Sequence, residues 1–211
     1  MTRMALNRLH FPVTVLGPGR RAGIWFQGCS IGCAGCMSLD TWADRGIEKV
    51  PVGAVLDWLE SLPGGGADGV TISGGEPTEQ PEALRALLDG LAAWRAGTGR
   101  DVLLFTGREP AWVRGAGAAV VRGADAVVAG PFVAAEAGTT PLRGSDNQEL
   151  VVLTERGRQA YDDLSGFRRE AVQLGADATG LWLIGIPMPG GLAAFDSGRP
   201  APGRKERRSW R

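Results

Sequence analysis

Short apolar runs that end at glycine alternate with helical stripes, and this alternation limits the possible folds more than any other feature. The runs GVTIS (69–73), DVLLF (101–105) and DAVVA (125–129) predict buried strands, and a glycine follows each within two residues. After the first run, an apolar stripe has the spacing of one helix face: Leu84, Leu87, Leu88, Leu91 and Trp94. Strands that alternate with helices predict βαβ units in a parallel sheet, with the functional site where the strands end.

The same pattern extends in both directions. RRAGIWFQG (20–28) predicts a buried strand that leads into a group of cysteines, and ELVVLT (149–154) predicts a further strand. VPVGAVLDWLESL (50–62) has the spacing of an amphipathic helix. REAVQL and GLWLIGI flank GADATG near the end and predict an antiparallel hairpin. We therefore expect a core domain over 1–155, an extension with a hairpin over 156–197, and a disordered basic tail over 198–211.

Composition excludes several classes of protein. Lys plus Arg and Asp plus Glu number 23 each, so no overall field favours nucleic acid or an anionic membrane. No apolar run approaches the roughly 18 residues that a bilayer span needs, and the N-terminus does not resemble a signal peptide. We therefore expect a cytoplasmic protein with no nucleic-acid partner and no membrane partner. An odd number of cysteines, 3, does not suit a closed disulfide framework.

All the cysteines, Cys29, Cys33 and Cys36, lie in the stretch GCSIGCAGC. Structural zinc usually needs a second ligand pair, but His10 lies far upstream. A redox dithiol of Cys33 and Cys36 would leave Cys29 without a role. An iron–sulfur cubane remains, in which three thiolates leave one iron open to a small molecule. Glycines between the cysteines allow unusual backbone angles in a tight loop.

This CxxxCxxC motif after a first strand resembles the radical S-adenosylmethionine enzymes. The resemblance implies a partial (β/α) barrel of parallel strands, a [4Fe-4S] cluster held by Cys29, Cys33 and Cys36, and S-adenosyl-L-methionine bound at the open iron. In that family, reductive cleavage of S-adenosylmethionine produces a 5'-deoxyadenosyl radical. The chain is thus expected to be a radical S-adenosylmethionine oxidoreductase.

A second motif follows the strand at 69–73: Gly74, Gly75, Glu76 and Pro77. Taken alone, GGEP is a strand-to-helix turn that places a carboxylate near a helix N-terminus, where it is favourable. Beside the cysteine loop it resembles the family segment that contacts the methionine ammonium group. By the same resemblance, Phe105, Thr106, Gly107 and Gly130 are candidates for the adenosine side.

The order of further segments narrows the likeness over about residues 11–154. GPGRRAGIWFQGC, DGVTISGGEP, VLLFTG, ADAVVAGPF and LRGSDNQ occur as in the glycyl-radical activating enzymes, notably those of anaerobic ribonucleotide reductases. The resemblance places four residues at a rim for substrate or partner: Arg143, Ser145, Asn147 and Gln148. It implies a glycyl-radical enzyme or peptide substrate as partner, and an electron donor such as flavodoxin or ferredoxin.

The chain departs from that pattern in places that concern the substrate. Met37-Ser38 follows the third cysteine where Tyr-Asn is common, and Phe105 replaces a tyrosine. The region beyond 155 has no counterpart in the resemblance. The alternative is therefore a biosynthetic radical enzyme that modifies a peptide or a small metabolite.

Overall fold

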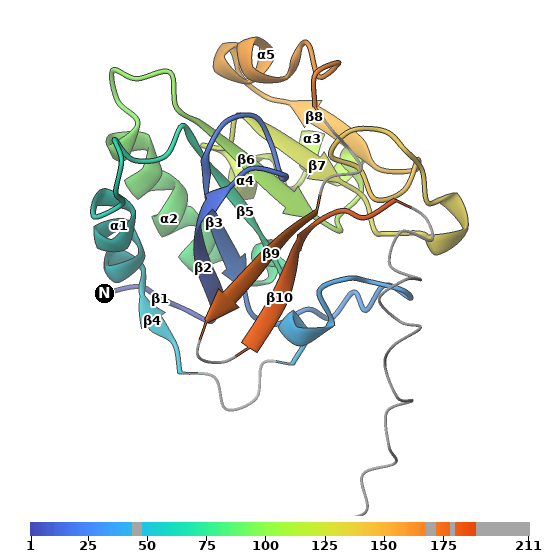
Figure 1. Cartoon of the computed structure of the whole chain (residues 1–211), viewed down its shortest axis with the longest axis horizontal. Coiled ribbons are helices and arrows are strands. Elements are labelled where there is room, and N and C mark those ends of the chain that lie inside the picture. The colour runs from blue at the N-terminus through green and yellow to red at the C-terminus, as the bar shows by residue number, and fades with distance from the viewer. Residues whose placement is uncertain (44–47, 168–171, 178–179, 189–211) are drawn as a thin grey trace, which may run out of the picture.

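A mixed α/β fold is built on one main sheet (Figure 1). In the computed structural model, which describes residues 1–43, 48–167, 172–177 and 180–188, this sheet has six strands. In spatial order they are β2 (Leu6–Val13), β3 (Arg21–Phe26), β5 (Gly69–Gly74), β6 (Asp101–Thr106), β7 (Ala126–Ala129) and β8 (Glu149–Val152). The strands expected from the apolar runs are therefore confirmed.

The sheet is parallel only in its centre. β3, β5, β6 and β7 pair in parallel, whereas β2 is antiparallel to β3 and β8 is antiparallel to β7. The parallel sheet expected from the sequence thus needs correction at β8. A parallel neighbour requires a crossover to the other end of the sheet. The loop after β7 instead returns at the same end and sets Glu149 opposite Ala129.

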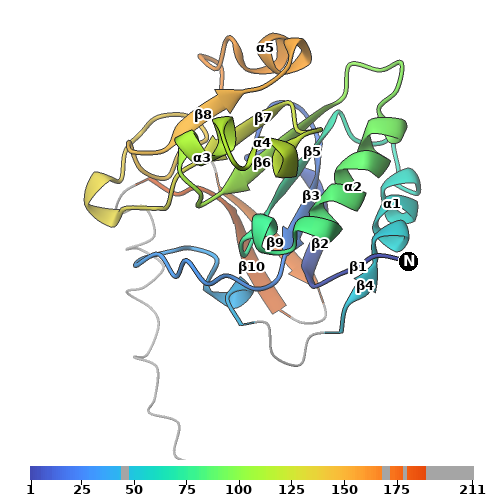
Figure 2. The same cartoon turned by 180° about the vertical axis from the view of Figure 1, so that it is seen from behind.

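Helices join the strands of the sheet. They are α1 (Val52–Glu60), α2 (Pro81–Trp94), α3 (Pro110–Arg114), α4 (Ala118–Val121) and α5 (Glu155–Tyr161), with 3-10 turns η1 (Leu39–Thr41), η2 (Pro77–Glu79) and η3 (Ala134–Glu136). Helices α1 to α4 cover one face of the sheet (Figure 2), whereas α5 packs through Tyr161 on the opposite face, against Leu103, Ala126 and Val128. Short strands β1 (Arg3–Met4) and β4 (Val50–Pro51) pair antiparallel.

The stripe on α2 packs as its spacing predicts. Pro81 opens α2, where its missing N–H costs nothing, and the leucines of the stripe are buried. They meet alternate residues of the strands, including Ile24, Ile72 and Leu104, in the larger apolar core. Burial of these side chains between α1, α2 and the sheet stabilises the helical side of the domain.

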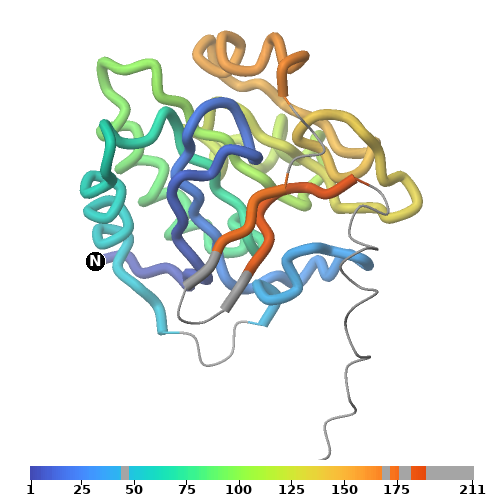
Figure 3. Tube along the Cα trace, viewed as in Figure 1, coloured from blue at the N-terminus to red at the C-terminus, as the bar shows by residue number. Residues whose placement is uncertain are grey.

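The opposite face is partly covered by a C-terminal hairpin of β9 (Val172–Asp177) and β10 (Gly180–Gly185), which confirms the hairpin expected near the end (Figure 3). Ile184 packs with Val13, Trp25 and Phe105. The Gln173 side chain donates to the Pro12 carbonyl at 2.7 Å and accepts from the Thr14 N–H at 3.2 Å. The hairpin is therefore fastened to the edge strand β2.

A buried ionic network lies on the same face of the sheet as the hairpin. The Arg21 guanidinium donates two bonds of 2.8 Å to the Asp101 carboxylate and one of 2.6 Å to Thr71 Oγ1. The Tyr161 hydroxyl donates to the same carboxylate. Arg21 starts β3 and Asp101 starts β6, so the network joins the amino ends of the strands and lies away from the carboxyl ends.

His10, the histidine upstream of the cysteines, belongs to the main sheet. It lies in β2 opposite Gly23, because β2 adds an antiparallel edge to the sheet. The expected tail at 198–211 lies outside the described residues. Within the described part of the chain, every helix is too short or too polar to cross a bilayer.

Candidate functional site

The three cysteines lie on a loop that starts where β3 ends. The Gly28 N–H donates to the Thr41 carbonyl at 2.7 Å, and the Cys29 N–H donates to the Trp42 carbonyl at 3.1 Å. These bonds close the base of the loop. Gly28 has φ +100°, in the region that favours glycine, so the chain turns sharply out of the strand. The cysteines are thus presented at the carboxyl end of the parallel strands.

All three thiols are free and partly buried. Burial raises the pKa of the Cys29 thiol, backbone N–H groups of Gly32 and Ile31 oppose this rise, and the carboxylates of Glu76 and Glu79 add to it. Loading with metal would therefore release a proton from this residue, because metals bind the thiolate.

The donor set of the loop suits an iron–sulfur cluster. Three thiols lie on one short loop, and space beside Gly32 is open, since an added Cβ would have only the Ser30 carbonyl, at 4.0 Å, within reach. In the described part of the chain, no three His, Cys, Asp or Glu side chains are gathered as a formed metal site. The loop therefore carries three suitable ligands, but their thiols do not yet point to one common position.

The GGEP turn lies directly on the backbone that leads to Cys29. The Gly75 N–H donates to the Phe26 carbonyl at 2.8 Å, and the Glu76 N–H donates to the Gly28 carbonyl at 2.7 Å. A Cβ on Gly75 would lie 2.1 Å from the Gly28 carbonyl oxygen, and one on Gly74 would lie 2.4 Å from that of Phe26. Both glycines are therefore needed for the contact between two backbones.

Glu76 is buried, with 1% of its surface exposed, and its carboxylate is occupied by protein donors. Oε1 accepts from the Thr78 N–H (3.0 Å), the Thr78 hydroxyl (2.6 Å) and the Thr106 hydroxyl (2.8 Å). Oε2 accepts from the Gly107 N–H at 2.8 Å. The side chain thus ties the GGEP turn to the end of β6, and its next residue, Pro77, is buried in η2.

The residues predicted for the adenosine side lie in two different places. Thr106 and Gly107 meet Glu76, and a Cβ on Gly107 would lie 2.6 Å from Ile31 of the cysteine loop. The Gly130 N–H donates to the Thr106 carbonyl at 3.2 Å. Phe105 points to the other side and packs near Trp25 and the hairpin. Three loops therefore converge at the ends of β3, β5 and β6, while Phe105 lies beneath them.

The segment 143–148 folds on the loop that follows β7. Gln148 donates to the Gly130 carbonyl and Asn147 donates to the Pro131 carbonyl, both at 2.8 Å. Arg143 donates to the Gln148 carbonyl at 2.8 Å. Ser145 is fully buried, and its hydroxyl accepts from the Val133 N–H at 3.1 Å. These polar groups hold the loop's own conformation, and the Ser145 side chain is not on a rim.

The structure adds two residues that the motifs did not identify. Phe132 bridges the cysteine loop and the 143–148 loop, since an added Cβ on Gly35 would lie 3.4 Å from its ring and one on Gly144 would lie 3.0 Å away. Arg108 follows Gly107, and its guanidinium lies 3.9 Å from the Glu79 carboxylate. The available signal was their position just after a strand end, since Arg108 directly follows Gly107 after β6 and Phe132 lies two residues beyond Gly130 after β7.

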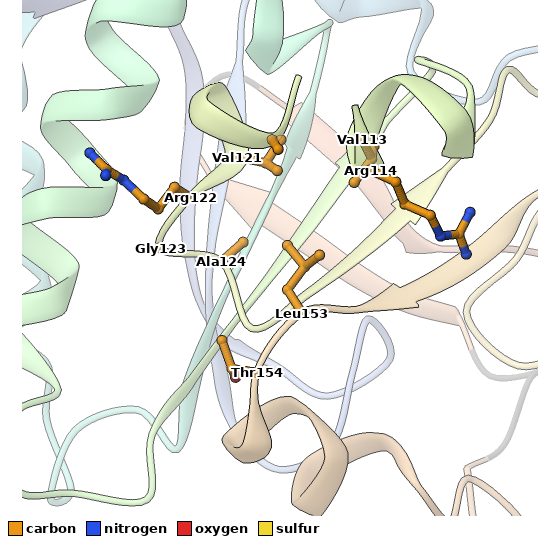
Figure 4. Close-up of a pocket in the computed structure, with 9 residues that line it drawn as sticks. Val113, Arg114, Val121, Arg122, Gly123, Ala124, Leu153 and Thr154 are labelled. Atoms are coloured by element: carbon orange, nitrogen blue, oxygen red, sulfur yellow. The ribbon is translucent and has the colours of Figure 1, made fainter. Parts of the chain in front are cut away.

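A cavity of about 390 Å³ lies elsewhere, beside α3, α4 and the end of β8 (Figure 4). Its wall includes the apolar side chains of Val113, Val121 and Leu153, with Arg114 and Arg122 near its margin. None of the residues predicted for the site lines it. The cavity is therefore separate from the converging loops.

Comparison with known proteins agrees with this geometry. A family described as "4Fe-4S single cluster domain" matches residues 15–151, which include the cysteine loop, the GGEP turn and the 143–148 loop. The chain is 37% identical over 93 residues to a pyruvate formate-lyase-activating enzyme of Clostridium pasteurianum, covering 40% of this chain and 38% of the relative. It is 40% identical over 76 residues to pyruvate formate-lyase 1-activating enzyme of Escherichia coli K12, covering 34% and 30%.

A third relative is similar over nearly its whole length. This is the anaerobic ribonucleoside-triphosphate reductase-activating protein of Enterobacteria phage T4, 26% identical over 149 residues, covering 70% of this chain and 93% of the relative. By contrast, the match spans only about a third of the length of the pyruvate formate-lyase-activating enzymes. The chain therefore belongs to the 4Fe-4S single cluster domain family, and it is similar to activating proteins of pyruvate formate-lyase and of anaerobic ribonucleoside-triphosphate reductase.

Proposed function

We propose that the protein binds a [4Fe-4S] cluster and S-adenosylmethionine and generates a glycyl radical on a partner enzyme. The observation that carries the proposal is the convergence of the cysteine loop, the GGEP turn and Thr106–Gly107 through backbone bonds and the Glu76 carboxylate. When bound, the cluster supplies the electron that cleaves S-adenosylmethionine to the 5'-deoxyadenosyl radical. The chain supplies binding, orientation and exclusion of water.

In this proposal, Cys29, Cys33 and Cys36 are the iron ligands. The turn at 74–77 receives the methionine part. The Glu76 carboxylate accepts four protein hydrogen bonds, so its main role is to fix the conformation of the turn. Its negative charge would then lie on the protein side of the turn and would not bind the ligand directly. Thr106, Gly107 and Gly130 remain candidates for the adenosine side because they lie on the same edge.

The proposed architecture is a core over 1–155 whose main sheet forms a partial barrel, with 156–197 as an extension. The parallel pairing of β3, β5, β6 and β7 and the packing of α1 to α4 on one face support it. In such a barrel, the face opposite the helices is the inner face, and the hairpin covers part of it near Trp25.

The relatives, which activate pyruvate formate-lyase and anaerobic ribonucleoside-triphosphate reductase, support a glycyl-radical enzyme as partner. An electron donor such as a flavodoxin or ferredoxin would reduce the cluster. One observation favours the alternative of a peptide or small metabolite as substrate. The hairpin packs on Trp25 and Phe105, so the chain itself covers part of the face that a docked partner would close.

Anaerobic reconstitution tests the cofactor chemistry. The wild-type protein is expected to hold about four irons and four sulfides, and its reduced electron paramagnetic resonance spectrum is expected to change when S-adenosylmethionine is added. Cys29→Ala, Cys33→Ala and Cys36→Ala are each expected to lose this spectrum. Ser38→Ala is the control, because the bond of Ser38 to Cys36 Sγ comes from its backbone N–H. A colourless protein with one zinc would refute the proposal.

The partner is tested separately. Reduced enzyme, S-adenosylmethionine and a glycyl-radical enzyme encoded by a neighbouring gene are expected to give a doublet radical signal on the partner, with 5'-deoxyadenosine formed alongside. If a peptide or small molecule consumes the radical stoichiometrically and no glycyl signal forms, the activase role fails and the alternative stands.

A further inference from the structure

Glu79 makes a direct contact with the cysteine loop that lies outside the roles discussed so far. Its carboxylate accepts the Ser30 N–H, at 3.1 Å to Oε2 and 3.3 Å to Oε1, and also the Ser30 hydroxyl. Ser30 is the residue after Cys29. One carboxylate in η2 therefore holds both donors of the residue beside the first cysteine.

This contact completes the attachment of the loop around Cys29. The Cys29 N–H donates a hydrogen bond to the Trp42 carbonyl. Two residues after Cys29, Ile31 packs against Gly107 at the end of β6. Glu79 fixes the residue between them. The first cysteine is thus held from both sides, while Cys33 and Cys36 lie farther along the loop. A site whose surroundings are already fixed loses less conformational freedom when a ligand binds.

Glu79 also places a negative charge near the first cysteine. Its carboxylate lies within hydrogen-bond distance of the backbone N–H of Ser30, the residue that follows Cys29. The Arg108 guanidinium lies 3.9 Å from the Glu79 carboxylate, and 42% of the Arg108 side chain is exposed. Water therefore screens this pair, and the Glu79 charge is only partly compensated.

We propose that Glu79 is a positioning residue for the cysteine loop, and that its charge lowers the reduction potential of the cluster bound there. This inference rests on the proposed cluster at Cys29, Cys33 and Cys36. The Ser30 contact fixes the backbone beside Cys29 before loading. A nearby negative charge disfavours uptake of an electron, and hydrogen bonding and charge near a cluster are known to set its potential. The bond also occupies the Ser30 N–H, which is then less available to a sulfide.

Two substitutions separate the hydrogen bond from the charge. Glu79→Gln keeps an acceptor for Ser30 and removes the charge, so it is expected to load a normal amount of iron and sulfide with a more positive midpoint potential. Glu79→Ala removes both, so it is also expected to release iron to a chelator roughly ten- to a hundredfold faster. Glu82→Gln is the matched control, because Glu82 is an exposed carboxylate in the first turn of α2. It is expected to behave as the wild type.

The measurements are a redox titration followed by electron paramagnetic resonance and iron release from the loaded protein. Wild-type potential and wild-type release rate in both Glu79 variants would overturn the inference while the proposed function stands. A wild-type protein that loads no cluster would instead refute the proposed function.

Hydrogen exchange of the unloaded protein tests the loop contact without any cluster. In Glu79→Ala, the peptide over 28–33 is expected to exchange faster than in the wild type, and in Glu82→Gln it is expected to be unchanged. Equal exchange of this peptide in the wild type and Glu79→Ala would overturn the positioning role whatever the outcome of loading. Circular dichroism of each variant checks that the fold is retained.

Discussion

Replacement of Glu76 by alanine tests whether its carboxylate is part of the fold. The side chain has 1% of its surface exposed and accepts bonds from two backbone N–H groups, those of Thr78 and Gly107. It also accepts the hydroxyls of Thr78 and Thr106. Hydroxyls can rotate to other acceptors, whereas backbone N–H groups cannot. The substitution therefore leaves two donors without partners in a buried place.

Each buried donor left unpaired costs about 1–3 kcal/mol, so Glu76→Ala is expected to lower the free energy of unfolding by about 2–6 kcal/mol. That is a large part of the roughly 5–15 kcal/mol that stabilises an ordinary domain. Glu76→Gln is expected to lie between the wild type and alanine. It keeps one acceptor oxygen but presents an amide donor to one of the groups that now donate to the carboxylate.

The assay is urea unfolding of the unloaded protein under anaerobic conditions, followed by circular dichroism. Glu82→Ala is the control and is expected to change the free energy of unfolding by less than about 0.5 kcal/mol, because Glu82 is exposed. If Glu76→Ala unfolds at the wild-type urea concentration, the buried hydrogen bonds do not stabilise the fold. Its role would then be limited to contact with a bound ligand.

Three further predictions concern packing and charge. Gly75→Ala is expected to lower the free energy of unfolding by at least about 1–3 kcal/mol in thermal unfolding, because its Cβ would lie 2.1 Å from the Gly28 carbonyl oxygen. Burial, together with the Asp101 carboxylate, raises the pKa of Tyr161 well above its usual value near 10. The unfolded chain therefore loses that proton first, so stability is expected to fall as pH rises above about 10, and less so in Tyr161→Phe, as urea titrations at several pH values can show. Ile184→Ala is expected to cost about 2–5 kcal/mol in the docking of the hairpin and to speed hydrogen exchange over 172–177, because Ile184 is 2% exposed.

Matched substitutions separate these effects from general damage. Gly97→Ala is the control for Gly75, because Gly97 has φ +69° but nothing within 4 Å of an added Cβ, so only the backbone cost of roughly 1 kcal/mol applies. If Gly75→Ala and Gly97→Ala lower the free energy of unfolding equally, the close backbone contact at Gly75 does not explain the effect. Leu174→Ala is the control for the hairpin, since Leu174 is 63% exposed. A Tyr161→Phe protein that loses stability with the same alkaline profile as the wild type would contradict the role of the tyrosine.

Much of the framework follows from local patterns. The sequence predicted the strands at 69–73 and 101–105, the α2 stripe and the C-terminal hairpin. Burial of one face makes apolar residues recur at the spacing of a helix or strand, and turns need particular residues. The cysteine spacing and GGEP indicated the family for a similar reason. A short loop that binds a cluster needs its ligands close together in sequence.

The partners of individual side chains depend on packing between distant segments. Glu76 meets Gly107, 31 residues away, and Glu79 meets Ser30, 49 residues away. The spacing of apolar residues along the chain does not predict such contacts, because they form only when parallel strands bring their carboxyl ends together. The same holds for Ser145, whose polar loop suggested a rim but whose side chain is buried. The direction of the edge strand β8 likewise depends on where the preceding loop returns, and apolar residues alone do not specify it.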